Sequence, residues 1–201
     1  MKKLKLFFAC LLMAVLSIGQ VWADPAAAGT TLFSENFGSY SADDVPSGSV
    51  TTATGRVVYG GANVTYSCTD GGSTTKIYNQ NTGGGTAPEI LVSKSNGTFV
   101  IEGIPSGDAQ AITVSWTQNK QEITVAASGT GYSGSLSGKP SAVGTRTFDI
   151  TVADGADATF TLTFTGSGSS NVRVDDIVVT VKTAGEGATP TCATPTFDPE
   201  D

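Results

Sequence analysis

The chain contains no histidine among its 201 residues, which removes the usual general base of enzymes and the imidazole ligands of metal sites. The absence of histidine also excludes Ser-His-Asp and Cys-His catalysis, in which histidine activates the nucleophile. A glycoside hydrolase could instead use two carboxylates that face each other roughly 5–9.5 Å apart across the substrate. Carboxylates outside residues 172–179 include Asp70, Glu89, Glu102, Asp108 and Asp149. No local motif singles out two of them, and we expect Glu102 and Asp149 to be solubilising surface groups.

A second chemical signal is one aromatic ring followed by three amide side chains, in the run Tyr78-Asn79-Gln80-Asn81. Sugar sites commonly stack a ring on the apolar face of a pyranose and bond its hydroxyls with a few placed polar groups. We therefore predict ligand-binding residues at Tyr78, Asn79 and Asn81, with an ordinary polar turn as the alternative. The run Gly83-Gly84-Gly85 predicts a flexible loop, and without a following helix it is no phosphate cradle.

Apolar and polar residues alternate with period two in several segments, and none shows a sustained helical period. Alternating residues of a strand point to opposite faces, so each segment buries one face. In one of them the apolar face is Ile112, Val114 and Trp116, so we expect Trp116 in the core rather than on a sugar-binding surface. The clearest segments are Thr98–Glu102, Ala111–Thr117, Glu122–Ala127, Thr147–Val152 and Thr159–Thr165. Residues 38–86 are less regular, with short strands predicted at Arg56–Tyr59, Val64–Ser67 and Lys76–Tyr78.

Turn signals rich in Gly, Pro, Asn and Asp separate these segments, for example Pro105-Ser106-Gly107-Asp108. Many short strands joined by such turns are typical of an antiparallel sandwich or barrel. The sequence therefore predicts an all-β domain, and loops at its edge are where function is expected.

The N-terminus predicts export. Three lysines precede an apolar run from Leu6 to Ile18, and Val21-Trp22-Ala23 supplies a cleavage site, so residues 1–23 fit a signal peptide. The run is too short for a membrane span, which needs about 20 apolar residues, so no membrane insertion is expected after cleavage. Cleavage removes the three lysines and changes the net charge from −7 to −10. An acidic chain without a basic cluster argues against nucleic acid and fits neutral glycans or cations, unless the acidity serves only solubility.

After the predicted domain the composition changes. We expect residues 24–30 to form an N-terminal extension, 31–182 the domain, and 183–191 a linker. Residues 192–201 look like the truncated start of a further β module, so the chain is expected to be a monomeric module of a larger protein. Cys68 and Cys192 could form a disulfide bridge, which the sequence alone leaves open.

Two motifs stand at opposite ends of this domain, Leu32-Phe33-Ser34-Glu35-Asn36-Phe37 and Val172-Arg173-Val174-Asp175-Asp176-Ile177-Val178-Val179. The pair resembles the jelly-roll β-sandwich modules of secreted and surface proteins of Bacteroidetes-type bacteria, which are similar to jelly-roll carbohydrate-binding modules. The resemblance implies an antiparallel jelly-roll β-sandwich of the galactose-binding-like kind. The segment Cys192–Phe197 is also similar to the first strand of small modules appended to bacterial β-hexosaminidases.

In jelly-roll carbohydrate modules the first and last strands commonly hold a structural calcium ion. Carried onto this chain, the resemblance implies Glu35, Asp175 and Asp176 as its ligands. Calcium prefers six to eight oxygens, which agrees with carboxylates. Simple alternation places Asp175 on the core face with Ile177, where a carboxylate is costly unless it is paired or bound to metal. Arg173 and backbone amides are the alternative partners.

Together these observations predict a non-catalytic carbohydrate-binding or adhesion module that is secreted or displayed on the cell surface. The alternative is a structural spacer or protein-interaction sandwich without a glycan ligand, and a glycoside hydrolase ranks third. Exposed aromatic residues in a cleft would favour the first function, and a smooth surface of Thr, Ser and Gly the second.

Overall fold

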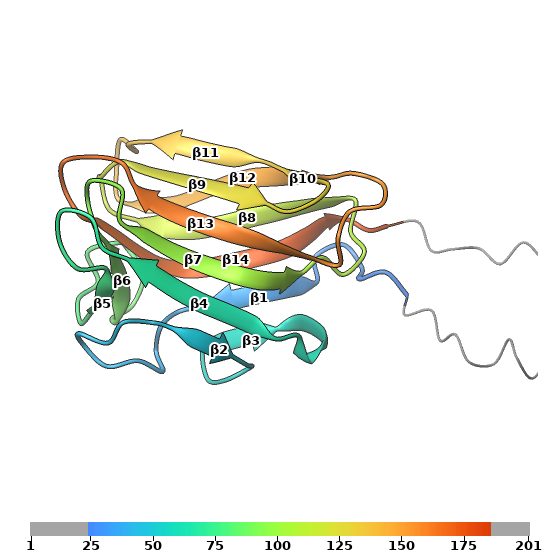
Figure 1. Cartoon of the computed structure of the whole chain (residues 1–201), viewed down its shortest axis with the longest axis horizontal. Coiled ribbons are helices and arrows are strands. Elements are labelled where there is room, and N and C mark those ends of the chain that lie inside the picture. Colours follow the sequence, from blue (N-terminus) through green and yellow to red (C-terminus); the bar gives the residue numbers. More distant parts are fainter. Residues whose placement is uncertain (1–23, 186–201) are drawn as a thin grey trace, which may run out of the picture. The chain divides into compact units, whose positions relative to one another are not determined.

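The computed structural model describes residues 24–185, and they form two antiparallel β-sheets (Figure 1). The eight-stranded sheet A runs in the order β10 (Tyr132–Ser133), β12 (Gly144–Val152), β8 (Ala111–Gln118), β14 (Val172–Thr183), β1 (Thr31–Glu35) and β3 (Arg56–Val58). Its other two strands are β6 (Glu89–Val92), which pairs with the start of β14, and β5 (Lys76–Tyr78), which pairs with β6. The six-stranded sheet B runs β11 (Ser135–Gly138), β9 (Ile123–Ser128), β13 (Thr159–Gly166), β7 (Thr98–Pro105), β4 (Val64–Thr69) and β2 (Gly48–Val50). The all-β, antiparallel fold predicted from alternation is confirmed.

Residues 1–23, the end of the predicted linker and the predicted module start at 192–201 lie outside the described residues. Within those described, no helix is long and apolar enough to cross a membrane.

The core lies between the two sheets and is built by the predicted alternation. Ile112, Val114 and Trp116 of β8 have no exposed surface. The Trp116 ring meets Phe164 of sheet B edge-on at 5.9 Å, and its Nε1–H donates to Oε1 of Gln118 at 2.8 Å. Trp116 is therefore a core residue, as predicted, and its indole N–H is satisfied inside the protein.

The alternation of polar and apolar residues did not predict strand β6. All four of its residues are buried, because it lies beside β14 and is covered on both faces. A strand buried on both faces carries no polar and apolar alternation, so its sequence Glu89-Ile90-Leu91-Val92 does not signal a face. Strands β2, β10 and β11 were also missed, since each has four residues or fewer and few apolar positions.

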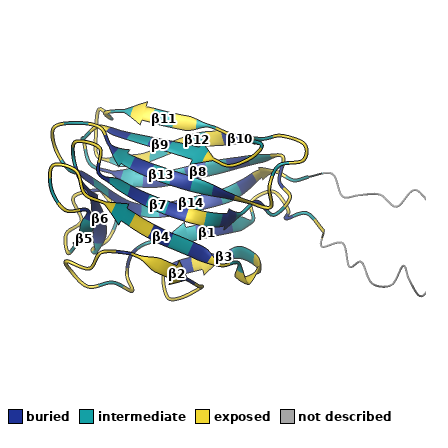
Figure 2. Ribbon diagram, in the orientation of Figure 1, coloured by how far each residue is buried: buried dark blue, intermediate teal, exposed yellow. Residues whose placement is uncertain are grey.

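The outward face of sheet B is covered by small hydroxyl side chains. The strand registers align one such row across five strands, comprising Ser137, Thr124, Thr165, Thr98 and Thr69. Two pairs in this row are hydrogen-bonded, Thr124 with Ser137 at 3.0 Å and Thr69 with Thr98 at 2.8 Å. Among the described residues the exposed large hydrophobic side chains are Val45, Val57 and Val143, and none is aromatic (Figure 2).

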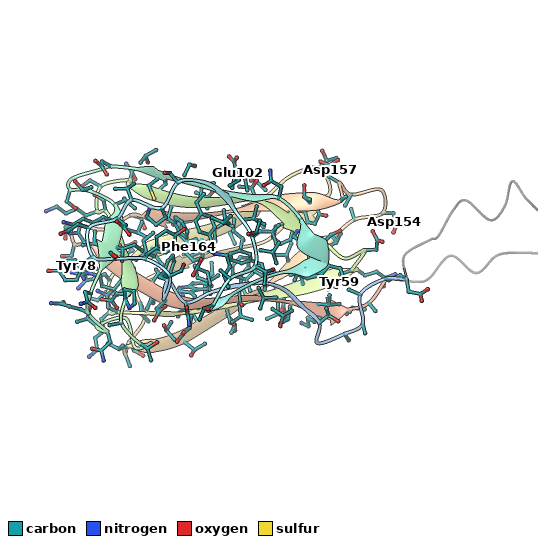
Figure 3. The ribbon with its side chains drawn as sticks, turned by 90° about the horizontal axis from the view of Figure 1, so that it is seen from below. Tyr59, Tyr78, Glu102, Asp154, Asp157 and Phe164 are labelled. Carbon is teal, nitrogen blue, oxygen red and sulfur yellow. The ribbon has the colours of Figure 1, made fainter. Side chains whose placement is uncertain are left out.

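The sandwich has two different ends. At one end the chain enters and leaves, with Gly29 N–H bonded to the carbonyl of Val181 and Ala26 N–H to that of Gly107. Strands β5 and β6 lie at the opposite end, and Figure 3 places Tyr78 there, with Asp154 and Asp157 towards the entry end. The loops that follow β5 therefore project away from the point where the chain continues.

Replacing Trp116 with alanine should lower the free energy of unfolding by about 3–5 kcal/mol, because it leaves a large cavity between the sheets. Urea unfolding followed by far-UV circular dichroism would measure the change. The control Thr145→Ala lies on the outward face of the adjacent strand and should change stability by less than about 0.5 kcal/mol. An unchanged stability in Trp116→Ala would place the ring outside the core.

Candidate functional site

Strand β14 contains a β-bulge at its two acidic residues. Asp175 pairs with Thr117 of β8, but the next pair is Val178 with Ser115, and Asp176 adopts a left-handed φ of 48°. The extra residue shifts the phase of the alternation. Val174 and Ile177 consequently both face the core with no exposed surface.

The predicted position of Asp175 on the core face is wrong for this reason. Asp175 lies on the outward face of sheet A, together with Thr117. Asp176 points to the same side of the sheet as Asp175. A carboxylate oxygen of each approaches the same residue, Gly85.

Residues 79–88, which connect β5 to β6 and are called the glycine loop below, cover these two acids. A Cβ on Gly85 would lie 2.1 Å from Oδ2 of Asp175 and 2.8 Å from Oδ2 of Asp176. A Cβ on Gly83 would lie 2.9 Å from Oε2 of Glu89. The glycines therefore allow the loop backbone to approach the carboxylates closely, which is a different role from the flexibility predicted for them.

Glu89 fixes the glycine loop to β14. It is fully buried and accepts hydrogen bonds from Gly83 N–H at 2.6 Å and from the Thr82 hydroxyl at 2.8 Å. Arg173 approaches the same carboxylate at 3.4 Å and places its guanidinium 3.8 Å from the centre of the Tyr78 ring. This cation–π contact holds the Tyr78 ring against Arg173, which also contacts Glu89. Tyr78 and Arg173 are nearly 100 residues apart in the sequence.

Asp175 is the exceptional group of this cluster. It has no exposed surface, and neither of its carboxylate oxygens has a hydrogen-bond partner among the described residues. Burial raises the pKa of Asp175 to about 7, and the charges of Asp176 and Glu89 act in the same direction. The amides of Asp176 and Thr86 lie near enough to lower that pKa, but outside hydrogen-bonding geometry. Arg173, one partner considered from the sequence, is bound to Glu89 instead.

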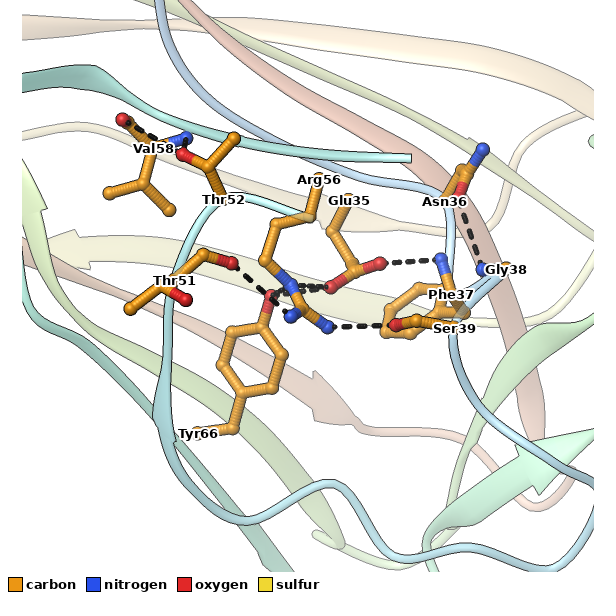
Figure 4. A network of polar contacts seen from close by, with 10 residues as sticks. All are labelled: Glu35, Asn36, Phe37, Gly38, Ser39, Thr51, Thr52, Arg56, Val58 and Tyr66. Atoms are coloured by element: carbon orange, nitrogen blue, oxygen red, sulfur yellow. Dashed lines mark hydrogen bonds and ion pairs between the residues drawn. The ribbon is translucent and has the colours of Figure 1, made fainter. Parts of the chain in front are cut away.

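Glu35 is buried in a different environment, between the sheets (Figure 4). Its Oε1 accepts the Phe37 N–H at 2.6 Å, and its Oε2 accepts Arg56 Nε–H at 2.5 Å and the Tyr66 hydroxyl at 2.7 Å. Arg56 also donates to the Ser39 hydroxyl at 3.2 Å. Tyr66 belongs to sheet B and Glu35 to sheet A, so this network joins the two sheets.

A calcium ligand set of Glu35, Asp175 and Asp176 does not fit this arrangement. Both oxygens of Glu35 already accept hydrogen bonds inside the protein, whereas the two aspartates point outward from the sheet. Residues 24–185 contain no group of three or more Cys, Asp or Glu side chains placed to hold a metal ion. The two buried, unpartnered oxygens of Asp175 are costly as a charged carboxylate unless a cation or a proton compensates them.

The predicted ligand residues Tyr78, Asn79 and Asn81 lie in and beside the glycine loop. Tyr78 is half-buried under Arg173, while Asn79 and Asn81 are exposed. Asn79 and Asn81 therefore lie on the same loop as Gly85, the residue that approaches Asp175 and Asp176, and Tyr78 lies directly before it. Glu89 was missed as a member of this site, although a carboxylate opening the apolar run Ile90-Leu91-Val92 was a signal for a buried, partnered acid.

The hollows on the described part of the chain include two of similar volume. One, of about 320 Å³, lies over β1, β3 and the β14 bulge and is lined in part by Asn36, Gly55 and Asp176. The other, of about 300 Å³, lies at the entry end and is lined in part by Asp108 and Asp157. Both are open depressions rather than enclosed cavities.

Glu102 and Asp149, two of the carboxylates considered for hydrolysis, are not arranged as a pair. Glu102 lies on the outward side of sheet B and Asp149 on that of sheet A, so the whole sandwich separates them. The Lys182 ammonium, 2.5 Å from Asp149, lowers the pKa of Asp149, with help from the Thr113 hydroxyl. A glycosidase acid needs a raised pKa, so Asp149 is unsuited to that role.

No family model matches the chain, and no curated protein matches it. Three chains of solved structures do match. One is the K3 cleaved adhesin domain of Lys-gingipain (Kgp) from Porphyromonas gingivalis w83, with a TM-score of 0.33 and 10% sequence identity. The match covers 75% of this chain and 99% of that one. Similarity at this level is too low to transfer any property from that domain to this chain.

Replacing Arg56 with methionine should lower the free energy of unfolding by about 3–5 kcal/mol, because it leaves the Glu35 carboxylate buried without its counter-charge. Chemical denaturation of the purified protein would measure this. The matched control Lys182→Met breaks the exposed pair with Asp149 and should cost less than about 1 kcal/mol. Equal losses in the two variants would contradict the structural role of the buried pair.

Stability should also depend on pH through Asp175. Its pKa is raised in the folded protein, so its favourable contribution is complete below pH 3.8 and is lost as the pH rises towards about 7. In metal-free buffer, Asp175→Asn should therefore gain stability relative to the wild-type protein across this range, by an amount on the order of a few kcal/mol. Urea unfolding at several pH values checks the slope, and a constant difference between the two proteins would contradict it.

Proposed function

We propose that this chain is a non-catalytic adhesion module of an exported bacterial protein, and that it binds a neutral glycan at the glycine loop. The observation that carries the proposal is the position of Asn79 and Asn81. They are exposed beside the Tyr78 ring, on a loop whose base Glu89 and Arg173 hold in place. Exposed amides on a supported loop are groups that can bond sugar hydroxyls without ordering a mobile segment first.

The proposed fold is a jelly-roll sandwich. The chain passes from sheet B to sheet A and back at β7, β8 and β9, and it crosses between the sheets again at β12, β13 and β14. Crossing between two facing sheets in this way is what the jelly-roll arrangement requires.

The location of the loop supports binding by a tethered module. The glycine loop lies at the end of the sandwich opposite the chain entry (Figure 1). In a monomeric module of a larger secreted or surface protein, this end would face outward. The net charge of −7 is compatible with an uncharged ligand and unfavourable for nucleic acid or an anionic membrane.

A second candidate function is a structural spacer without a glycan ligand. The observation that favours it is the hydroxyl-covered outward face of sheet B and the absence of exposed aromatic rings among residues 24–185. Stacking on exposed rings is the usual source of affinity for sugars, and Tyr78 offers only a half-buried ring that Arg173 already contacts.

A glycan array probed with the purified protein separates the two functions. We expect binding to a neutral glycan, and Asn79→Ala or Asn81→Ala should weaken it by roughly tenfold through the loss of one hydrogen bond. These two variants leave the Arg173–Tyr78 contact intact, so they test the amides alone.

Asp154→Asn is the matched control, because Asp154 is an exposed polar residue at the opposite end of the sandwich. It should bind as the wild-type protein does. A folded protein that binds no glycan on the array would leave the spacer as the better function.

A further inference from the structure

The hollow over β1, β3 and the β14 bulge, called the valine hollow below, has an aliphatic floor. The strand registers place Val178 of β14, Ser34 of β1 and Val57 of β3 in one row on the outward face of sheet A. Val57 is 42% exposed, which makes it one of the few large hydrophobic side chains that the described part of the chain leaves open. The floor is therefore a strip of two valines with only a small hydroxyl side chain between them.

Two polar side chains stand at one end of this floor. Asp176 comes from the bulge, and Asn36 follows β1, with its N–H donating to the carbonyl of Gly55 at 3.1 Å. Oδ1 of Asn36 accepts the Gly38 N–H at 3.0 Å, so the Nδ2 donors point away from Gly38 (Figure 4). A Cβ on Gly55 would lie 1.9 Å from Oδ1 of Asn36, so only glycine leaves room for this amide. The hollow thus combines an apolar floor with one carboxylate and one amide donor.

Asp176 is the charged group of the valine hollow that lacks a counter-charge. Glu35 and Arg56 also line the hollow, but they form a buried ion pair with each other. None of the ion pairs among the described residues includes Asp176. A second carboxyl group lies beside it, because Oδ2 of Asp175 and Oδ2 of Asp176 both lie within 3 Å of the position that a Cβ on Gly85 would take. This end of the hollow therefore attracts positive charge.

Unfavourable backbone conformations hold both polar groups in place. Asp176 has a φ of 48°, and Phe37, directly after Asn36, has a φ of 58°. The left-handed conformation is costly for a bulky residue such as phenylalanine. Strain of this kind concentrates at binding sites, where the surrounding structure maintains it. Here it places a carboxylate and an amide from two different strands at the same end of one hollow.

We propose that the valine hollow binds an arginine side chain on a peptide segment of a partner protein. The methylene stem of the arginine would lie on Val57 and Val178, as long cationic side chains do on apolar surface. Its guanidinium would form paired hydrogen bonds with the Asp176 carboxylate, a geometry that lysine does not offer. The Nδ2 donors of Asn36 would bind a main-chain carbonyl of the same segment. The net charge of −7 favours the approach of a basic partner.

The lining of the hollow distinguishes this occupant from others. Sugars are commonly held by an aromatic ring, whereas no aromatic side chain of residues 24–185 lines this hollow. Residues 186–201 contain no lysine or arginine, so this segment of the chain supplies no cationic side chain for the site. The inference is independent of the glycan function, since the valine hollow contains no residue of the glycine loop.

The experiment is an NMR titration of the ¹⁵N-labelled protein with a pentapeptide of alanine that has blocked ends and a central arginine. The matched peptide carries citrulline, which keeps the shape of arginine without its charge. We expect the arginine peptide to shift the signals of the Asn36 side-chain amide, Gly55 and Val57, and to leave Asn79 and Asn81 unchanged. The citrulline peptide should bind at least about tenfold more weakly, because the charge-assisted hydrogen bonds are lost.

Three variants test the parts of the hollow separately. Asp176→Asn should weaken binding of the arginine peptide by at least about tenfold, and asparagine tolerates the left-handed conformation. Val57→Thr keeps the side-chain shape but makes the floor more polar, and should weaken binding by roughly threefold. Asp149→Asn removes an exposed acid from the same face of sheet A and should bind as the wild-type protein does. Melting temperatures of the variants show whether each remains folded.

Several results would overturn the proposal. They are no binding of the arginine peptide, equal binding of the citrulline peptide, full binding by a folded Asp176→Asn variant, or signal shifts at Asn79 and Asn81 in place of the hollow. A dimer of the free protein in sedimentation that is lost in Asp176→Asn would assign the hollow to a second copy instead. Asn79→Ala, which tests the glycan function, should bind the arginine peptide as the wild-type protein does, so the two proposals fail separately.

Discussion

Strand β14 hydrogen-bonds to β1, β6 and β8, and the arrangement of sheet A depends on the register of these three pairings. The register cannot remain regular along the whole strand. The core needs both Val174 and Ile177, three residues apart, while alternation places only residues an even number apart on one face. The bulge at Asp176 resolves this conflict, and it turns two carboxylates out towards the glycine loop. The candidate site is thus a consequence of how the core is filled.

The protein buries two of its carboxylates in opposite ways. Glu35 is surrounded by donors from β3, β4 and the segment after β1, so its charge is compensated by Arg56 and its oxygens are occupied. Asp175 lies under backbone that donates no hydrogen bond to it. A satisfied buried carboxylate stabilises the joint between the sheets, whereas an unsatisfied one costs free energy until a proton or a cation arrives. The two acids differ in their hydrogen-bond partners rather than in their depth.

The surfaces of the sandwich differ in what they offer to a partner. The outward face of sheet B presents small hydroxyl groups, four of which bond to one another in two pairs, and no exposed aromatic ring among the described residues. The glycine loop instead presents exposed amides above a base that is held by an ion pair and a cation–π contact. Specific binding favours rigid supports with free polar groups, so the loop end is better suited to recognition than the broad face.

The sequence by itself determined the fold class and much of the core. Period-two alternation in segments such as Ala111–Thr117 predicted antiparallel strands and placed Trp116 inside, because burial of one face is a local property of a strand. It also placed Asn79 and Asn81 in a polar loop that directly follows Tyr78. Tertiary structure alone decided the rest. The pairing of Glu35 with Arg56, the burial of Glu89 and the phase shift at Asp176 all depend on which strands become neighbours, and alternation within one strand carries no information about that.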